Sequence, residues 1–185
     1  MKRAGILLAA AIVAGCALGA READRYLILE TPASATPAAT RGDVRAMPTT
    51  AAAFYDTQSI AFSREPGTRA YYQFNHWTER PQRAIHVQLA SRFSADEPHA
   101  RLVLETHLDE IYHDAAVPPG TSRIVITATL VDAASRAAIA RRTFVHSAPA
   151  TSYDAPGAVR AFDVALGALL DDVMAWVDTE ASKRP

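Results

Sequence analysis

The chain has 185 residues, of which 49% are hydrophobic and 21% are charged, proportions that are typical of folded globular proteins. Its formal net charge is −1 at pH 7, and no basic tract in it is denser than a pair such as Arg141-Arg142, so we do not expect nucleic acid as a partner. Cys16 is the only cysteine, so no intramolecular disulfide can form and stability must come from packing.

The N-terminal 15 residues have the pattern of an export signal. A charged start at residues 1–3 is followed by an apolar run at residues 4–13 and by two small residues before Cys16. The apolar run is shorter than the roughly 20 residues that span a bilayer as a helix. We therefore expect residues 1–15 to be a signal peptide that is removed on export.

The segment Val13-Ala14-Gly15-Cys16 resembles the lipobox of bacterial lipoproteins. This resemblance implies that the Cys16 thiol receives a diacylglycerol and that Cys16 becomes the new N-terminus. A plain secretory signal with an incidental cysteine is the alternative, but an unpaired thiol is a liability in an oxidising compartment. We expect a stable lipid anchor, no other cofactor, and a polar tether at residues 16–24. Ala17 follows the cysteine where an aspartate tends to retain lipoproteins at the inner membrane, which favours the periplasmic face of the outer membrane.

The first part of the mature chain predicts short strands. Residues 26–29 read as a strand, and residues 31–42 are rich in Ala, Pro and Thr, as loops are. Residues 44–47 predict a second strand, which Pro48 limits to a short edge position.

A hairpin and a helix follow in the chain. Residues 59–64 and 69–75 flank Glu65-Pro66-Gly67-Thr68, where Pro-Gly favours a tight turn between two antiparallel strands. Pro81 then stands where a helix would begin. Three apolar residues recur every four positions after it: Ile85, Leu89 and Phe93.

The second half predicts a meander and a long helix. Three runs separated by turn-like stretches predict long antiparallel strands: residues 101–112 and 124–131, whose side chains alternate between two faces, and residues 139–146, which are rich in residues that favour strands. Residues 156–179 carry an apolar stripe at helical spacing, formed by Val159, Phe162, Leu166, Leu169, Val173 and Val177. Helices separated by a meander bury their stripes on the sheet, so we expect one α+β domain over residues 25–180 with two amphipathic helices on a largely antiparallel sheet.

The residues most suited to metal chemistry lie along one predicted strand: His107, Asp109, Glu110, His113 and Asp114. Regular alternation past Tyr112 would put His107, Asp109 and His113 on one face, where they could bind a metal. The alternative is that these side chains keep the outer face of a half-buried sheet solvated, and we favour it. Signature motifs of serine hydrolases, P-loop proteins and zinc proteases are absent from the sequence, so we predict no metal site and no enzyme activity.

Aromatic residues are concentrated at residues 54–56 and 70–77. Large aromatic side chains most often fill a core, and Trp77 just before a helix could serve as a packing staple. The alternative is a ligand platform.

These segments follow one another as they do in one lipoprotein family: Phe54-Tyr55-Asp56, Ile60-Ala61-Phe62-Ser63-Arg64, Tyr71-Tyr72, and Asn75-His76-Trp77-Thr78-Glu79-Arg80-Pro81. The sequence resembles the ABC-type transport auxiliary lipoprotein family, which includes the paraquat-inducible lipoprotein C. The resemblance extends to the lipobox, the strand at residues 26–29 and the closing helix. It marks five candidate family-motif or partner-binding residues: Tyr55, Asp56, Tyr72, Trp77 and Pro81.

The resemblance implies a mixed sheet with helices packed on it, akin to the anticodon-binding-domain arrangement. It also implies a non-catalytic outer-membrane accessory of a mammalian-cell-entry lipid transporter. The implied partner is the periplasmic lipid-carrying protein of that ABC transporter; phospholipid is a further candidate ligand, and a homo-oligomer is compatible with this role. The alternatives are an assembly or structural lipoprotein that binds a β-barrel or cell-wall partner, and a periplasmic hydrolase that uses the His107 to Asp114 cluster.

Overall fold

A computed structural model describes residues 22–31, 43–93 and 100–183. The predicted signal peptide, the lipid-attachment residue Cys16 and most of the loop predicted at residues 31–42 lie outside these residues.

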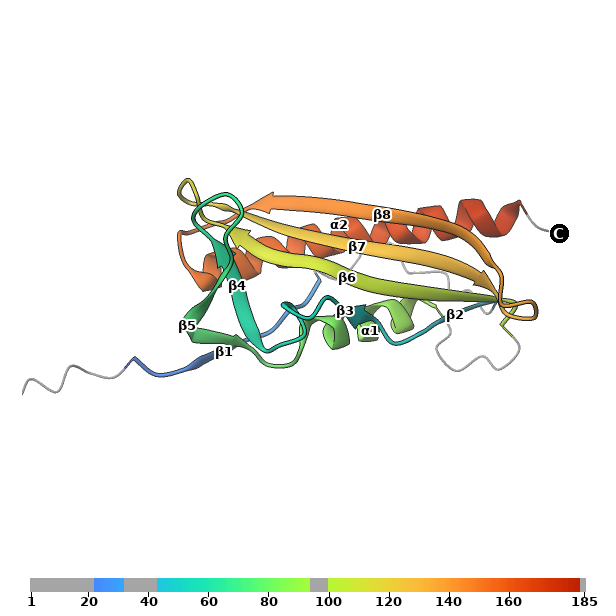
Figure 1. The fold of residues 1–185 in the computed structure, drawn as a ribbon, viewed down its shortest axis with the longest axis horizontal. Coiled ribbons are helices and arrows are strands. Elements are labelled where there is room, and N and C mark those ends of the chain that lie inside the picture. Colours follow the sequence, from blue (N-terminus) through green and yellow to red (C-terminus); the bar gives the residue numbers. More distant parts are fainter. Residues whose placement is uncertain (1–21, 32–42, 94–99, 184–185) are drawn as a thin grey trace, which may run out of the picture.

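The described chain forms one eight-stranded mixed sheet and two helices, as the α+β prediction required (Figure 1). The elements in chain order are β1 (Arg25–Leu27), β2 (Val44–Ala46), β3 (Thr50–Ala51), β4 (Ser59–Ser63), β5 (Ala70–Trp77), α1 (Pro81–Arg92), β6 (Leu102–Asp114), β7 (Thr121–Asp132), β8 (Ala138–Pro149) and α2 (Ala155–Ser182).

The predicted meander is the antiparallel centre of the sheet, formed by β6, β7 and β8. The strand order is β1-β5-β4-β6-β7-β8, and β2 and β3 also pair with β6. The three short strands β2, β3 and β4 all run parallel to β6, one after another along its length. A strand as long as β6 can therefore hold the N-terminal half of the chain along one edge, which makes the sheet mixed.

The hairpin and both helices begin and end close to their predicted positions. Gly67 has a φ of 77° in the turn between β4 and β5, a conformation that glycine adopts without a steric penalty. Pro81 is the first residue of α1, where its missing N–H is not needed. Asp154 caps α2, because its side chain accepts a hydrogen bond of 2.8 Å from the Gly157 backbone N–H.

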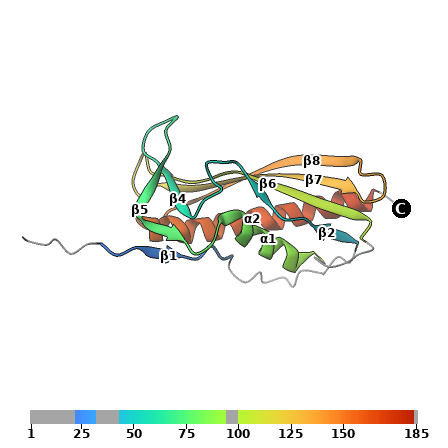
Figure 2. The same cartoon turned by 60° about the horizontal axis from the view of Figure 1, so that its bottom comes forward.

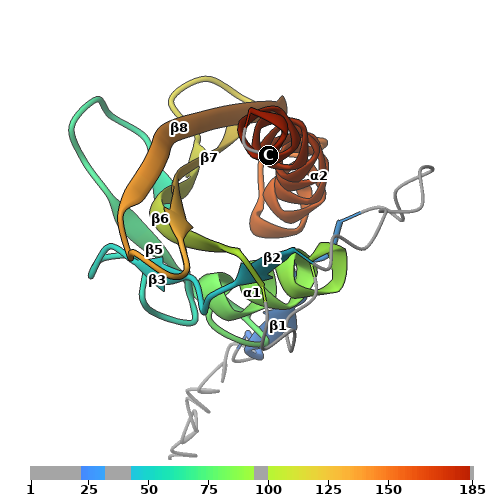
Figure 3. The same cartoon turned by 90° about the vertical axis from the view of Figure 1, so that its right-hand side faces the viewer.

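Both helices lie on the same side of the sheet, and the β4–β5 hairpin projects on the other side (Figure 2). Seen end-on, the sheet curves around α2, which lies on its concave side (Figure 3). Trp77 meets Phe162 of α2 edge-on with ring centroids 5.6 Å apart, and Phe144 meets Trp176 in the same way at 5.7 Å. These aromatic contacts join α2 to both the β5 and the β8 ends of the sheet.

A bulge in β6 overturns the regular alternation considered from sequence. The register with β7 shifts between Leu108 and Glu110. Before the shift the inward-facing residues are even-numbered, as Leu108 is. After it they are odd-numbered, as the buried Ile111 and His113 are. His107 and His113 therefore face opposite sides of the sheet.

Within residues 22–31, 43–93 and 100–183, neither helix combines the length and apolar character that a membrane span requires.

Candidate functional site

Two of the five motif residues are packing residues in this structure. Trp77, at the end of β5, is 2% exposed and belongs to the main core. Pro81 is buried at the start of α1. Trp77 ends β5 and Pro81, four residues later, begins α1. The Trp-x-x-x-Pro part of the motif therefore sets the connection between this strand and this helix.

Tyr72 is a partner of the buried His113. The Tyr72 hydroxyl lies 2.7 Å from His113 Nδ1, and His113 Nε2 lies 3.0 Å from the carbonyl oxygen of Pro119. A carbonyl can only accept, so Nε2 carries the proton and Nδ1 accepts from the tyrosine hydroxyl. Burial lowers the pKa of His113 and raises the pKa of Tyr72 to about 12, which keeps both groups neutral near pH 7.

His113 therefore does not belong to an exposed polar face, and this part of our favoured interpretation of the acidic and histidine cluster was wrong. The bulge turns it inward, where it holds β6 to β5 and to the loop before β7. His107 lies elsewhere and its Nδ1 is 2.7 Å from the Thr50 hydroxyl. The described residues contain no group of three His, Cys, Asp or Glu side chains placed to hold a metal ion.

Tyr55 is held by an arginine on the opposite side of the sheet from α2. Arg69 Nε donates to the Tyr55 hydroxyl at 3.2 Å, and the Arg69 guanidinium carbon lies 3.5 Å from the ring centroid of Tyr112. Glu110 accepts from Arg123 at 3.0 Å and lies 3.9 Å from Arg69. Together these contacts fix the start of β5 and the loop before β4 against β6 and β7.

Phe54 and Tyr71 form an exposed aromatic pair beside this cluster. Their rings stack with centroids 4.6 Å apart, and the Tyr71 hydroxyl donates to the Phe54 carbonyl at 2.7 Å. Phe54 is 37% exposed and Tyr71 is 40% exposed. The pair is accessible and is held by the ring stack and the hydrogen bond, as suits an aromatic anchor in a protein interface. We call Phe54 and Tyr71 the aromatic pair below.

Asp56 joins the same loop to the start of α1. Its carboxylate accepts a hydrogen bond of 2.8 Å from Arg80 and a second one from the side-chain amide of Gln82. A carboxylate beside a helix N-terminus also interacts favourably with the helix dipole. Asp56 thereby ties the position of the aromatic pair to the helix layer.

Asp163 of α2 holds the segment that follows β1. Its Oδ1 accepts from the Glu30 backbone N–H at 2.9 Å. Burial, helped by the negative charge of Glu30, raises the pKa of Asp163 to about 6. The charged form is thus disfavoured in the folded protein.

Replacing Asp163 by asparagine should raise the free energy of unfolding at pH 7.5 by about 1–2 kcal/mol. The neutral amide keeps an oxygen for the Glu30 N–H and removes the penalty of a half-buried charge. Because the folded-state pKa is raised, the wild-type carboxylate costs stability above about pH 6, and this cost disappears as the pH falls towards 4. Urea unfolding at pH 7.5 and pH 4.5 should show a clearly larger gain at the higher pH. Asp171→Asn, on an exposed position of the same helix, is the control and should change little at either pH.

The described fold is an α+β domain with helices on one side of a mixed sheet and an aromatic and arginine cluster on the other. A sequence profile described as "ABC-type transport auxiliary lipoprotein component" matches residues 26–174. The chain belongs to this family, and the recognition made from its motifs is confirmed.

Solved structures share this fold. A protein of family DUF330 from Xanthomonas campestris has a TM-score of 0.71 and 19% sequence identity, with 85% of this chain and 95% of that chain covered. A second structure, described as an uncharacterized protein, has a TM-score of 0.62 and 7% identity, with 81% and 97% covered. The comparison with curated proteins finds no match.

Sequence reasoning missed the residues that make the motif surface accessible. Phe54 and Tyr71 stood within the quoted segments but were not selected, and Arg69 was not singled out at all. The period of two in this strand places Tyr71 and Gln73 on one face and Tyr72 and Phe74 on the other, and the structure exposes the first two more than the second two. The alternation alone does not say which face is the accessible one.

Proposed function

We propose that this chain is a non-catalytic accessory of a mammalian-cell-entry lipid transport system, which docks the periplasmic lipid-carrying part at the outer membrane. The observation that carries the proposal is the family match over residues 26–174, since an auxiliary component of an ABC-type system works beside other subunits. A lipid on Cys16 would hold the domain at the periplasmic face of the membrane.

The aromatic pair is the surface on which we expect the transport partner to dock. Interface energy concentrates in a few aromatic and arginine side chains near the centre of a contact. Arg69 lies between Tyr55 and Tyr112, so the loop and strand that carry the pair lose little conformational freedom when a partner binds. The Tyr72 and His113 side chains face inward and hydrogen bond to each other, which suits packing more than catalysis.

The docking role predicts that Phe54→Ala with Tyr71→Ala will weaken binding to the mammalian-cell-entry protein by at least about tenfold, because each truncation at an interface anchor costs more than about 1 kcal/mol. Binding can be measured by surface plasmon resonance with the lipidated chain captured in nanodiscs. The control is Val164→Ser, which changes a half-exposed aliphatic side chain on α2 and should leave this affinity unchanged. Wild-type affinity in the double variant would contradict docking through the aromatic pair, and recovery of a β-barrel without any transporter subunit would favour the structural alternative.

The anchor is tested separately by Cys16→Ala. We expect this variant to remain in the periplasm without membrane association, and to fail to restore envelope integrity in cells that lack the chain. Fractionation and a detergent-sensitivity assay measure the two effects. Full rescue by the unlipidated protein would contradict anchoring as part of the function.

A further inference from the structure

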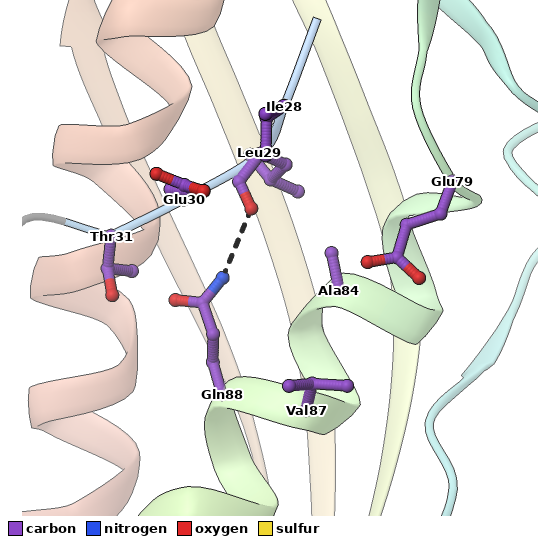
Figure 4. Close-up of a pocket in the computed structure, with 8 residues that line it drawn as sticks. All are labelled: Ile28, Leu29, Glu30, Thr31, Glu79, Ala84, Val87 and Gln88. Atoms are coloured by element: carbon purple, nitrogen blue, oxygen red, sulfur yellow. Dashed lines mark hydrogen bonds between the residues drawn. The ribbon is translucent and has the colours of Figure 1, made fainter.

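A groove on the helix side of the molecule is not used by the docking proposal. Residues 28–31, which continue from the edge strand β1, run beside α1 and border an open hollow of about 280 Å³ (Figure 4). Ala84, Val87 and Gln88 of α1 line one side, and Ile28 and Leu29 line the other. We call this the β1–α1 groove.

The walls of the β1–α1 groove include aliphatic side chains that the fold leaves in water. Ile28 is 55% exposed and Val87 is 56% exposed, although both are aliphatic and both border the same hollow. Single exposed aliphatic residues are common on protein surfaces, but two that border one concave site with further apolar atoms between them indicate a place for another apolar group.

The polar side chains that border the groove include two carboxylates and one amide oxygen without a donor. Gln88 Nε2 donates to the Leu29 carbonyl at 3.3 Å, while Gln88 Oε1 is buried and has no hydrogen-bond partner among the described residues. The carboxylates of Glu30 and Glu79 also border the groove. Arg83 Nε lies 3.1 Å from Glu79 Oε2, so this arginine neutralises the charge of Glu79. The carboxylate of Glu30 adds a further negative charge at the groove. Figure 4 shows both carboxylates and the Gln88 amide around the same opening.

An occupant that complements this chemistry supplies donors, positive charge and aliphatic surface together. A phospholipid with an anionic headgroup would bring its charge towards Glu30 and Glu79, which is unfavourable. An extended peptide can place an ammonium or guanidinium group near Glu30 and cover Ile28 and Val87 with aliphatic side chains. We propose that the β1–α1 groove binds an extended segment of a partner protein in which a lysine or arginine is flanked by aliphatic residues. This proposal does not depend on the transporter assignment.

Peptide titration of the full lipidated chain in nonionic detergent micelles tests the proposal. The probe is an acetylated and amidated pentapeptide with a central lysine flanked by two leucines on each side, and a matched peptide has glutamate in the centre. Two-dimensional ¹H–¹⁵N NMR should show that the lysine peptide shifts the amide signals of residues 28–31 and 84–88 in a saturable manner. The glutamate peptide should bind at least about tenfold more weakly, as expected when an attractive charge contact becomes a repulsive one.

Variants separate the contributions of charge and apolar contact. Glu30→Gln should reduce the affinity for the lysine peptide by about three- to tenfold. It should not reduce the affinity for the glutamate peptide, because it removes a repulsive charge. Val87→Ser should weaken both peptides, because it removes part of the apolar wall. Phe54→Ala, on the aromatic pair, is the matched control and should change the affinity for neither peptide. The groove proposal and the docking proposal are therefore tested by different variants, and one can fail without the other.

Three outcomes would overturn the proposal. The first is equal affinity for the lysine and glutamate peptides. The second is an unchanged affinity of the lysine peptide for a chain that carries both Glu30→Gln and Val87→Ser. The third is saturable binding of dihexanoyl phosphatidylglycerol to the same amides with displacement of the lysine peptide, which would assign the groove to an anionic lipid.

Discussion

Replacing Trp77 by alanine should lower the free energy of unfolding by about 3–5 kcal/mol, which is a large part of the total stability of a domain of this size. Trp77 is 2% exposed and its ring packs edge-on against Phe162 of α2. The substitution would leave a cavity between β5 and the long helix, where the surrounding side chains can collapse only in part. Urea unfolding followed by circular dichroism measures the loss.

A comparison with Phe54→Ala separates packing from partner binding within the family motif. Phe54 is 37% exposed, so its truncation should change the free energy of unfolding by less than about 1 kcal/mol. Trp77→Phe keeps an aromatic ring and should lose less stability than Trp77→Ala. A destabilisation by Trp77→Ala as small as that by Phe54→Ala would contradict the packing role of Trp77 and would restore the ligand-platform interpretation.

Gly120→Ala should be the second strongly destabilising substitution, with an expected loss of about 3 kcal/mol or more. Gly120 has a φ of 91°, which alanine adopts only with strain. An added methyl group would also lie 2.0 Å from His113 Nε2 and 2.6 Å from the Asp114 carbonyl oxygen. One of these atoms belongs to the main chain of β6 and cannot move away easily. The imidazole of His113 is held from both sides by hydrogen bonds to Tyr72 and Pro119.

Gly67→Ala is the matched control for this second prediction. Gly67 has a φ of 77°, yet a methyl group there would meet no atom within 4 Å. Its substitution should therefore show the backbone strain alone, at about 1 kcal/mol. The excess loss in Gly120→Ala reports the close approach to His113, and it should be accompanied by a change in the Tyr72 hydroxyl and His113 ring signals in NMR spectra. Equal losses in the two variants would show that the glycine at 120 is needed for its backbone conformation only.

The fold could be predicted to a large extent because its main elements have strong local patterns. The apolar stripe of α2, the alternation in β7 and the Pro-Gly turn between β4 and β5 each follow from periodicity or turn chemistry within a few residues. Pro81 likewise marks the first residue of α1. Each of these patterns consists of residues close together in the chain, so it can be recognised without knowing which distant segments pack against the element.

The sheet order could not be predicted in the same way. The parallel pairing of β2, β3 and β4 with β6 joins residues that are 51 to 58 positions apart, for example Phe62 with His113 and Val44 with Leu102. Strands of two to five residues carry too few side chains to specify a partner. Their position is decided by the length of β6 and by the space that α1 and α2 leave on one side of the sheet.

The sequence by itself determined the family, through the order of its aromatic segments, and the kinds and limits of the longer elements. The tertiary structure decided which motif residues are accessible. The bulge after Leu108 turns His113 inward to Tyr72, and the core takes Trp77 and Pro81, while Phe54 and Tyr71 remain at the surface. The physical reason is that exposure depends on neighbours brought from distant parts of the chain, and a single strand pattern contains no information about those neighbours.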